Sequence, residues 1–437
     1  MSSPLPPLAH AASGWRPLLT GEAAERALTT AEEIAAAIGR PPALPASAAS
    51  GFWRRDYRDF SLADGRAGIA VFLSYLEAAR PGRGYGEWAL WQLGEAVAGT
   101  ARVVSPPRLY SGFPGVAWAL EHLAGRLYEM DGEDAGEEVA RTLAELLGEA
   151  PWDRPVELVG GAAGLGVYAL ERLGRPHGEQ CLRRTIERLA EAAERRGDGI
   201  TWWTPASWLT SGDRERFPAG RYTLGVSHGV PGVIAFLGEA AAALDSAAAW
   251  TLLRGAVAWL CAQKLPAGSP STFPNAVAPG ATPAPTRLSW CYGDLGISLA
   301  LLGAARRAGE REWEAEALAL ARGSAARRFE VSGVVDPCLC HGAAGAAHLF
   351  NRLFQSTGEP LFAAAARGWI ERIFALRRAE GARAGFMAWL PGESGGYEWL
   401  DDPGLLTGAA GVGLALLAAA TTIEPAWDRI LLVSVPS

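Results

Sequence analysis

The feature that most constrains this chain is a pair of glycines, Gly-x-x-Gly, that heads an apolar run seven times in 437 residues. A single pair carries little information, because helix contacts in membranes use the same pattern. Seven pairs in phase, at steps of 47 to 68 residues, indicate an internal repeat. The first glycines of the pairs are Gly65, Gly112, Gly161, Gly229, Gly293, Gly342 and Gly408.

Each repeat has the pattern of two helices. The segment after each glycine pair is apolar on nearly all sides, which predicts a helix that is buried all round. Between consecutive pairs lies a segment such as 137–150 or 181–196, in which apolar residues recur at helical spacing and charges occupy the other face. This second segment predicts an outer helix that faces water. Glycines at the start of the inner helix permit close backbone contacts, and the first amide N–H groups of that helix point outward.

Such helix pairs could form an open solenoid or a closed ring. An open solenoid needs end repeats with a polar outer face, whereas the first and last repeats are as apolar as the middle ones. We therefore predict an all-α fold, an α/α toroid of seven inner and seven outer helices, with all seven glycine pairs at one rim.

This toroid is expected to form a single domain over residues 1–437, with an N-terminal extension at 1–50. Three segments rich in Trp, Pro and Gly precede repeats and are expected to be rim loops: 201–225, 266–290 and 386–404. A lid or a peptide groove over the rim is one interpretation of these loops, and plain connections that cover the mouth of the ring are the other.

Charge and cysteine usage exclude several classes of protein. The chain has 40 Lys and Arg against 47 Asp and Glu and no basic cluster, which argues against nucleic acid as a partner. Five scattered cysteines do not resemble the disulfide framework of a small secreted domain, so reduced thiols are expected. The N-terminus lacks the pattern of a signal peptide, and no uncharged apolar run reaches the roughly 20 residues of a transmembrane helix. We expect a soluble, cytoplasmic protein.

Four of the eleven Cys and His residues fall at one phase of three successive repeats. Cys291 and Cys340 each stand two residues before the first glycine of their repeats, and His228 and His341 each stand one residue before it. A lone Cys or His of this kind is most often a packing residue. The shared phase favours a site instead, because the starts of the inner helices converge at the rim.

The set Cys291, Cys340 and His341 suits zinc. Two thiolates and one imidazole are soft ligands, and three protein ligands leave the fourth tetrahedral position open, as in catalytic zinc sites. A thiol bound there would be deprotonated yet remain nucleophilic. Cys338 is a weaker candidate, since in extended chain it points away from Cys340. The remaining thiols, Cys181 and Cys261, lie in outer-helix segments and are expected to be inert.

The motifs RLSWCYGDLG, CLCHGAAG and GVSHGVPG, together with the seven repeats and the closing AWDRILLVSVPS, resemble those of the LanC-type lanthipeptide cyclases, the lanthionine synthetase C family. The resemblance covers nearly the whole chain. It implies a double-layered α toroid that holds Zn²⁺ and adds the cysteine thiol of a peptide to dehydroalanine or dehydrobutyrine, forming a thioether ring.

By this resemblance Cys291, Cys340 and His341 are the zinc ligands, and His228 is the residue that exchanges a proton with the substrate. Arg287 and Tyr292 match the arginine and the tyrosine that flank the first zinc cysteine in the family.

One position departs from the family pattern. Glu157 stands four residues before the first glycine of the third repeat, where the family usually has aspartate, and Asp153 lies four residues further back. Glu157 is either a catalytic acid or base, or an ordinary acid at a helix start that the helix dipole favours.

The expected mechanism follows from these parts. Zinc would hold the thiol close to the alkene. Addition of the thiolate to the alkene places negative charge on the carbonyl oxygen, which helix-start amides and the cation Arg287 would stabilise. His228, with an ordinary pKa of about 6.5, suits protonation of the α-carbon. Tyr292 is either a participant or a packing residue, and Trp290 is expected to be a wall.

Other functions remain open at this stage. The substrate implied is a dehydrated precursor peptide, whose dehydration would need a separate dehydratase. The alternative is a LanC-like zinc protein that binds glutathione or a peptide thiol without ring formation. A glycosidase would need facing carboxylates, for which Asp64 and Glu157 are the candidates, but it leaves the thiols unexplained. A prenyltransferase-like subunit typically has aspartate among its zinc ligands.

Overall fold

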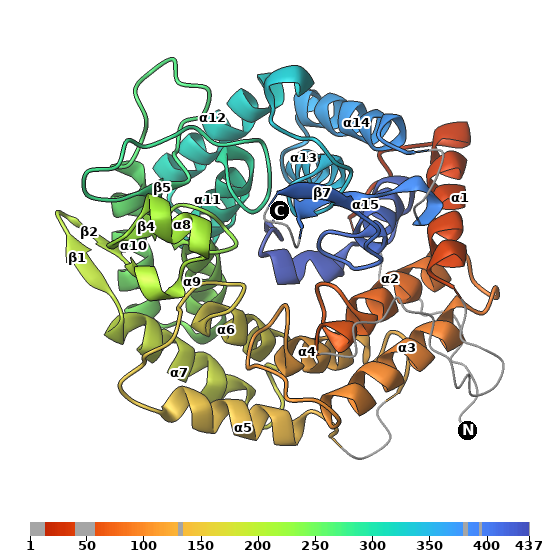
Figure 1. The fold of residues 1–437 in the computed structure, drawn as a ribbon, viewed down its shortest axis with the longest axis horizontal. Helices are drawn as coiled ribbons and strands as arrows, with labels where there is room; N and C mark the ends of the chain where they lie inside the picture. The colour runs from red at the N-terminus through yellow and green to blue at the C-terminus, as the bar shows by residue number, and fades with distance from the viewer. Residues whose placement is uncertain (1–13, 40–56, 130–133, 379–382, 393–395, 437) are drawn as a thin grey trace. The chain divides into compact units, whose positions relative to one another are not determined.

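The computed structural model describes most of the chain as helices joined by loops and short strands (Figure 1). The described residues are 14–39, 57–129, 134–378, 383–392 and 396–436. They fall into two compact units, the first comprising Met1–Gly136, Val335–Asn351 and Ala363–Trp427, and the second Glu137–Val334, Arg352–Phe362 and Asp428–Ser437. Among the described helices, none has the length and apolar character required to cross a bilayer.

In the first unit, α2 is the central helix and packs against α3, α4 and α15, while α1 packs along α15 (Figure 1). The helices here are α1 (Gly21–Ile38), α2 (Arg66–Ala79), α3 (Tyr85–Thr100), α4 (Phe113–Leu123), α15 (Ala409–Ala420) and most of α14 (Pro360–Ala375). Helix α13 (Ala343–Thr357) begins in this unit, and β6 (Ala388–Pro391) pairs antiparallel with β7 (Tyr397–Leu400).

In the second unit, α9 contacts α6, α10 and α11, and α11 packs against α12 (Figure 1). The longer helices are α5 (Glu137–Gly148), α6 (Ala162–Glu171), α7 (Gly178–Glu191), α9 (Val230–Leu244), α10 (Ala247–Cys261), α11 (Asp294–Ala308) and α12 (Arg311–Ala326). The smaller elements are β1 (Glu194–Arg196), β2 (Gly199–Thr201), β3 (Thr204–Pro205), α8 (Ser211–Arg216), β4 (Gly220–Thr223) and β5 (Ala276–Val277).

The glycine pairs mark the starts of the inner helices. The first glycine is the N-cap of α2, α4, α6, α9, α11 and α15, and α13 begins directly after Gly342. Burial separates the two classes of helix. Eleven of the twelve residues of α15 are buried, whereas α7 buries six of fourteen along one face.

Steric contact explains why both positions are glycine. In six repeats a Cβ on the second glycine would lie 1.9 to 2.2 Å from the carbonyl oxygen of the residue six positions earlier, far inside van der Waals contact. These glycines are Gly68, Gly115, Gly232, Gly296, Gly345 and Gly411. A Cβ on the first glycine of any repeat would likewise meet backbone or neighbouring atoms within 2.5 Å. Each inner helix therefore folds back onto the segment that leads into it.

Residues 21–38, within the stretch that the sequence assigned to an N-terminal extension, form helix α1. One face of α1, including Ala27, Ala31 and Ile34, is buried, and the helix packs on α15. Six outer helices lie between consecutive glycine pairs, and α1 supplies the outer partner of the last inner helix from the other end of the chain. Residues 1–13 and 40–50 of that stretch lie outside the described residues.

The expected rim loops contain small sheets. Segment 201–225 contributes β3, α8 and β4, and segment 266–290 contributes β5, so that β3, β4 and β5 form one antiparallel sheet. The described part of segment 386–404 forms the β6–β7 hairpin. The described parts of these segments are thus ordered by backbone hydrogen bonds.

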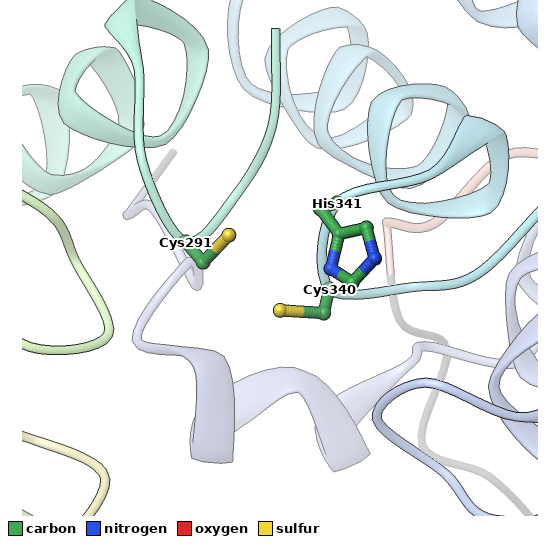
Figure 2. A group of neighbouring side chains, drawn as sticks. All are labelled: Cys291, Cys340 and His341. Carbon is green, nitrogen blue, oxygen red and sulfur yellow. The ribbon is translucent and has the colours of Figure 1, made fainter. Parts of the chain in front are cut away.

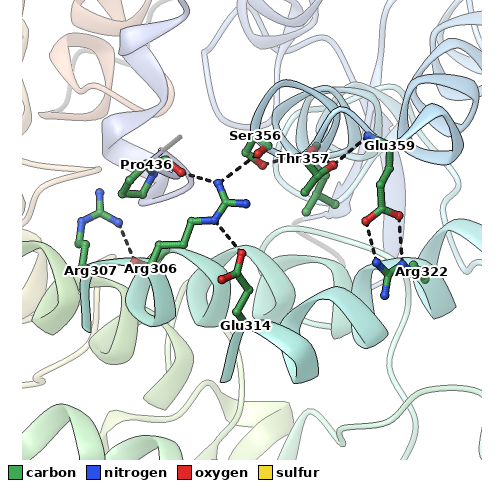
Figure 3. Close-up of polar contacts among 10 residues, drawn as sticks. Arg306, Arg307, Glu314, Arg322, Ser356, Thr357, Glu359 and Pro436 are labelled. Atoms are coloured by element: carbon green, nitrogen blue, oxygen red, sulfur yellow. Dashed lines mark hydrogen bonds and ion pairs between the residues drawn. The ribbon is translucent and has the colours of Figure 1, made fainter. Parts of the chain in front are cut away.

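The C-terminal segment of the second unit is fixed by arginines (Figure 3). Arg306 on α11 donates to the backbone carbonyls of Ser356 (3.1 Å) and Pro436 (2.5 Å), and it pairs with Glu314 on α12 (3.0 Å). Arg307 donates to the Ser434 carbonyl at 3.2 Å. Residues 434–436 are therefore part of the packed structure.

Replacing Gly115 with alanine is expected to destabilise the protein by roughly 3 kcal/mol, because its Cβ would lie 1.9 Å from the Leu109 carbonyl oxygen. The control is Gly94→Ala in α3, where a Cβ meets no atom within 4 Å and alanine favours the helix. Urea unfolding followed by circular dichroism measures both variants. Equal midpoints for the two variants would contradict this account of the repeat.

Candidate functional site

Backbone hydrogen bonds join the segments that lead into the third, fourth and fifth inner helices. The Val159 N–H donates to the Ser227 carbonyl (3.1 Å), and the Ser227 N–H donates to the Cys291 carbonyl (3.4 Å). The Ser227 hydroxyl reaches the same Cys291 carbonyl at 3.3 Å. These three residues each stand two positions before the first glycine of their repeats, so equivalent residues of neighbouring repeats are held side by side.

The same bonds recur at the other repeats. The Cys340 N–H donates to the Leu406 carbonyl (2.9 Å), the Leu406 N–H to the Ala63 carbonyl (2.9 Å), and the Ala63 N–H to the Tyr110 carbonyl (2.9 Å). All four residues again stand two positions before the first glycine. Cys291 and Cys340 therefore occupy equivalent, backbone-fixed positions, as the shared phase in the sequence indicated.

The three residues predicted as metal ligands form a group that could hold a metal ion. One donor atom from each of Cys291, Cys340 and His341 lies within 4.8 Å of those of the other two. Figure 2 shows the two sulfur atoms beside the His341 ring. Cys291 is buried, whereas Cys340 and His341 are partly exposed.

A buried carboxylate that the sequence analysis missed orients His341. The Nε2 atom of His341 lies 3.2 Å from Oδ2 of Asp336, whose side chain is fully buried, which leaves Nδ1 on the side of the cysteines (Figure 2). Metal-binding histidines commonly use the second ring nitrogen in this way. Asp336 also accepts from the N–H groups of Cys338 and Trp389. Burial opposes its charge, but His341 and these donors outweigh it, so the pKa of Asp336 is lowered.

The thiol of Cys338 contacts the backbone of its own loop. Its Sγ accepts the N–H of His341 at 3.4 Å, and it lies within 4.8 Å of donor atoms of Asp336 and His341. Burial raises the pKa of Cys338 to about 11, which keeps the thiol protonated. Burial also raises the pKa of Cys181, to about 11, and that of Cys261. All five cysteines are free of disulfides.

His228 and Glu157 form an ion pair. The Nδ1 atom of His228 lies 3.1 Å from Oε2 of Glu157, whose two oxygens also accept the N–H groups of Val159 (2.7 Å) and Gly160 (2.9 Å). These bonds fix the carboxylate at the start of α6. The His228 side chain lines a cavity, and 48% of its surface is exposed. Partial desolvation disfavours the imidazolium, but Glu157, and more weakly Cys291, outweigh it and raise the pKa of His228 above its ordinary value.

Tyr292 lies beside this pair. Its ring centroid is 6.5 Å from that of His228, and burial raises the pKa of its phenol, so the hydroxyl stays protonated. The backbone of Tyr292 bonds to the Ser289 hydroxyl, whose oxygen is 3.6 Å from Sγ of Cys291. The neighbouring Trp290 is fully buried and donates from Nε1 to the Leu431 carbonyl (2.9 Å). Its side chain therefore has a packing role.

A cavity of about 180 Å³ has both His228 and Tyr292 in its lining, together with Glu157 and Arg221. Arg287 stands in the segment before α11 but does not line this cavity. The arginine in the lining is Arg221 on β4, which donates two hydrogen bonds of 2.8 and 3.0 Å to Asp213. Arg221 could not be predicted from the sequence, since only the pairing of β4 with β3 brings it into the cavity lining with His228.

Comparisons with known proteins agree with this fold. A family model for lanthionine synthetase C-like protein matches residues 56–432. The solved structure of a nisin cyclase is 18% identical in sequence and aligns with a TM-score of 0.68, over 87% of this chain and 93% of that chain. A sugar epimerase from a ruminal bacterium aligns with a TM-score of only 0.35, at 10% identity, over 59% of this chain and 86% of that chain. No curated protein matches the sequence significantly.

The fold and the Cys/His group define a repeat protein of paired helices with three side chains placed so that they could hold a metal ion. The chain belongs to the lanthionine synthetase C-like family, whose model spans most of its length. The predicted all-α, α/α-toroid class is confirmed by the structural match to nisin cyclase.

Replacing Glu157 with glutamine is expected to lower the pKa of His228, because the carboxylate that offsets burial is lost. A raised folded-state pKa means that the pair stabilises the fold below the ordinary histidine pKa, and that this contribution is lost as pH rises through the folded-state value. An NMR titration with ¹³C-labelled histidine measures the shift. Glu179→Gln, on the exposed face of α7, is the control, and an unchanged pKa of His228 in Glu157→Gln would refute the pairing.

Proposed function

We propose that this protein is a zinc-dependent peptide cyclase, which adds a peptide cysteine thiol to dehydroalanine or dehydrobutyrine and so forms a lanthionine or methyllanthionine ring. The observation that carries the proposal is the convergence of Cys291, Cys340 and His341 within 4.8 Å. Residues 1–437 would act as one cyclase domain, of which the family model matches 56–432.

The donor set fits zinc. Two sulfur donors and one imidazole suit Zn²⁺ better than Mg²⁺ or Ca²⁺, and three protein ligands leave a place for a substrate thiol. Asp336 would fix the His341 ring through Nε2, with Nδ1 as the donor. When bound, the zinc ion would supply the positive charge that deprotonates the incoming thiol.

His228 would donate the proton that completes the addition. Thiolate attack on the β-carbon of the dehydro residue leaves charge on the carbonyl oxygen, and the α-carbon must then be protonated. Glu157 holds His228 at 3.1 Å and raises its pKa, which favours the protonated form. Glu157 thus acts in place of the family aspartate as a positioning residue, whereas Asp153 is exposed and has no part in the pair.

The enolate oxygen would be stabilised at the start of α9. This helix begins directly after Gly229, and Gly229 and Val230 line the same cavity as His228. Pro231 has no N–H, and the Gly232 N–H donates to the Gly229 carbonyl at 3.1 Å. The Val230 N–H, at the positive end of the helix dipole, would therefore be the donor. Tyr292, protonated and in the same lining, could donate a further hydrogen bond, whereas Arg287 would act only from outside the cavity.

The substrate would be a dehydrated precursor peptide, supplied by a separate dehydratase. The second candidate is a LanC-like zinc protein that binds glutathione or a peptide thiol and makes no ring. The replacement of the family aspartate by Glu157 is the observation that keeps this candidate in view. Incubation with a dehydrated peptide separates the two, because only a cyclase removes the free thiol without changing the peptide mass.

The variant Cys291→Ala is expected to lose bound zinc, because one of the two sulfur ligands is gone. The control is Cys261→Ala, at the end of α10, which should keep one equivalent. Inductively coupled plasma mass spectrometry of purified proteins measures the metal. Full zinc occupancy in Cys291→Ala would remove the ligand assignment.

The variant His228→Ala is expected to retain zinc and to form rings at least about 100-fold more slowly, the usual contribution of a general acid. Alkylation of remaining peptide thiols, read by mass spectrometry, measures ring formation over time. The matched control is His177→Ala, a histidine before α7 that should leave the rate unchanged. Undiminished cyclisation by His228→Ala would argue against a proton-donor role.

A further inference from the structure

The cavity at His228 extends beyond the groups that the chemistry needs. Part of its lining is aromatic and comes from the segment 201–225, through Trp202, Trp203 and Trp208. Helix α9 contributes the buried side chains of Val230 and Val233. The insertion between the third and fourth repeats therefore builds a largely apolar chamber against the start of an inner helix.

The aromatic wall is fixed in place. Trp202 is buried and donates from Nε1 to the Leu189 carbonyl at 2.9 Å, and Trp203 packs edge-on against Tyr222 with ring centroids 4.7 Å apart. Trp208 differs, because 38% of its surface is exposed and it ends a single 3₁₀ turn, Ala206–Trp208. Two tryptophans thus form rigid walls, and Trp208 forms an edge that a ligand could cover.

The charges in the cavity wall are already paired. Arg221 is 9% exposed, donates from both terminal guanidinium nitrogens to Asp213, and lies 5.0 Å from the ring of Phe217. Glu157 and His228 are bound to each other. A charged ligand would find no unpaired opposite charge among these four side chains and would lose its own hydration. An uncharged side chain suffers no such penalty.

The volume of the cavity limits which uncharged side chains fit. The cavity measures about 180 Å³. An apolar cavity of about 150 Å³ in another protein holds one benzene molecule. A single six-membered ring therefore fits, and it would stack against tryptophan faces, which adds to the gain from burial.

We propose that this chamber, bounded by Trp202, Trp208 and Val233, is a subsite for one aromatic side chain of the peptide, at the residue next to the dehydroamino acid. This inference rests on the proposed function, which supplies the peptide and places the acceptor carbon at His228. The chamber would then select among acceptor sites in a precursor by the neighbour of each dehydroamino acid.

Three peptides test the subsite. They share one cysteine and one dehydroalanine and differ only at the residue next to the dehydroalanine, which is Phe, Ala or Asp. Wild type is expected to favour the Phe peptide over the Asp peptide by about tenfold or more in kcat/KM, the effect of burying one aromatic side chain. Trp208→Ala should reduce this preference several-fold. Trp91→Ala, on outer helix α3 and outside the chamber, should keep it.

A binding measurement makes the result independent of catalysis. Fluorescein-labelled peptides with alanine in place of cysteine are titrated with wild type and with Trp208→Ala, and anisotropy gives Kd. The Phe peptide should bind wild type more tightly than the Ala and Asp peptides, and should lose affinity for Trp208→Ala. Equal Kd values for the three peptides overturn the subsite, even if wild type cyclises them all. If wild type forms no rings but still binds the Phe peptide more tightly than the Ala and Asp peptides, the subsite is supported and only the proposed function is overturned.

Discussion

Close contact between each glycine pair and the backbone that leads into it is the constraint on which the structure depends. In six repeats the second glycine lies against the carbonyl of the residue six positions earlier, and in all seven the first glycine lies similarly close to neighbouring atoms. Each inner helix and its leading segment therefore form one compact corner. Backbone hydrogen bonds then join equivalent residues of neighbouring corners, as between Ser227 and Cys291. The position of a residue within its repeat therefore fixes where it lies in the structure. Cysteines at the same position of two repeats come to lie at equivalent points of the backbone.

Chemistry is placed on this scaffold by side chains that differ from repeat to repeat. Two corners carry cysteine, and buried Asp336 fixes the ring of His341. The corner of the fourth repeat carries His228, which the carboxylate of the third repeat holds at 3.1 Å. Longer insertions add the walls around His228, including the ion pair of Arg221 with Asp213. The repeated backbone thus supplies geometry, and the insertion 201–225 supplies part of the lining of the cavity at His228.

The sequence predicted those features that follow from periodicity. The seven inner helices, their glycine starts and the meeting of Cys291, Cys340 and His341 depend on phase alone, which can be counted along the chain. The packing of α1 on α15 could not be predicted in this way, because it joins opposite ends of the chain. Arg221 depends on strand pairing in 201–225, where turns and short strands leave no clear period. The position of Asp336 in the repeat could have drawn attention to it. It stands six residues before Gly342, as Arg287 stands six residues before Gly293.

X-ray absorption spectroscopy at the zinc edge, on zinc-loaded wild type with and without a cysteine-containing dehydrated peptide, tests the central claim most directly. The account predicts a first shell with two sulfur atoms and at least one nitrogen, from Cys291, Cys340 and His341, and a third sulfur after the peptide is added. A shell of oxygen and nitrogen alone, or a sulfur count that the peptide leaves unchanged, would contradict it.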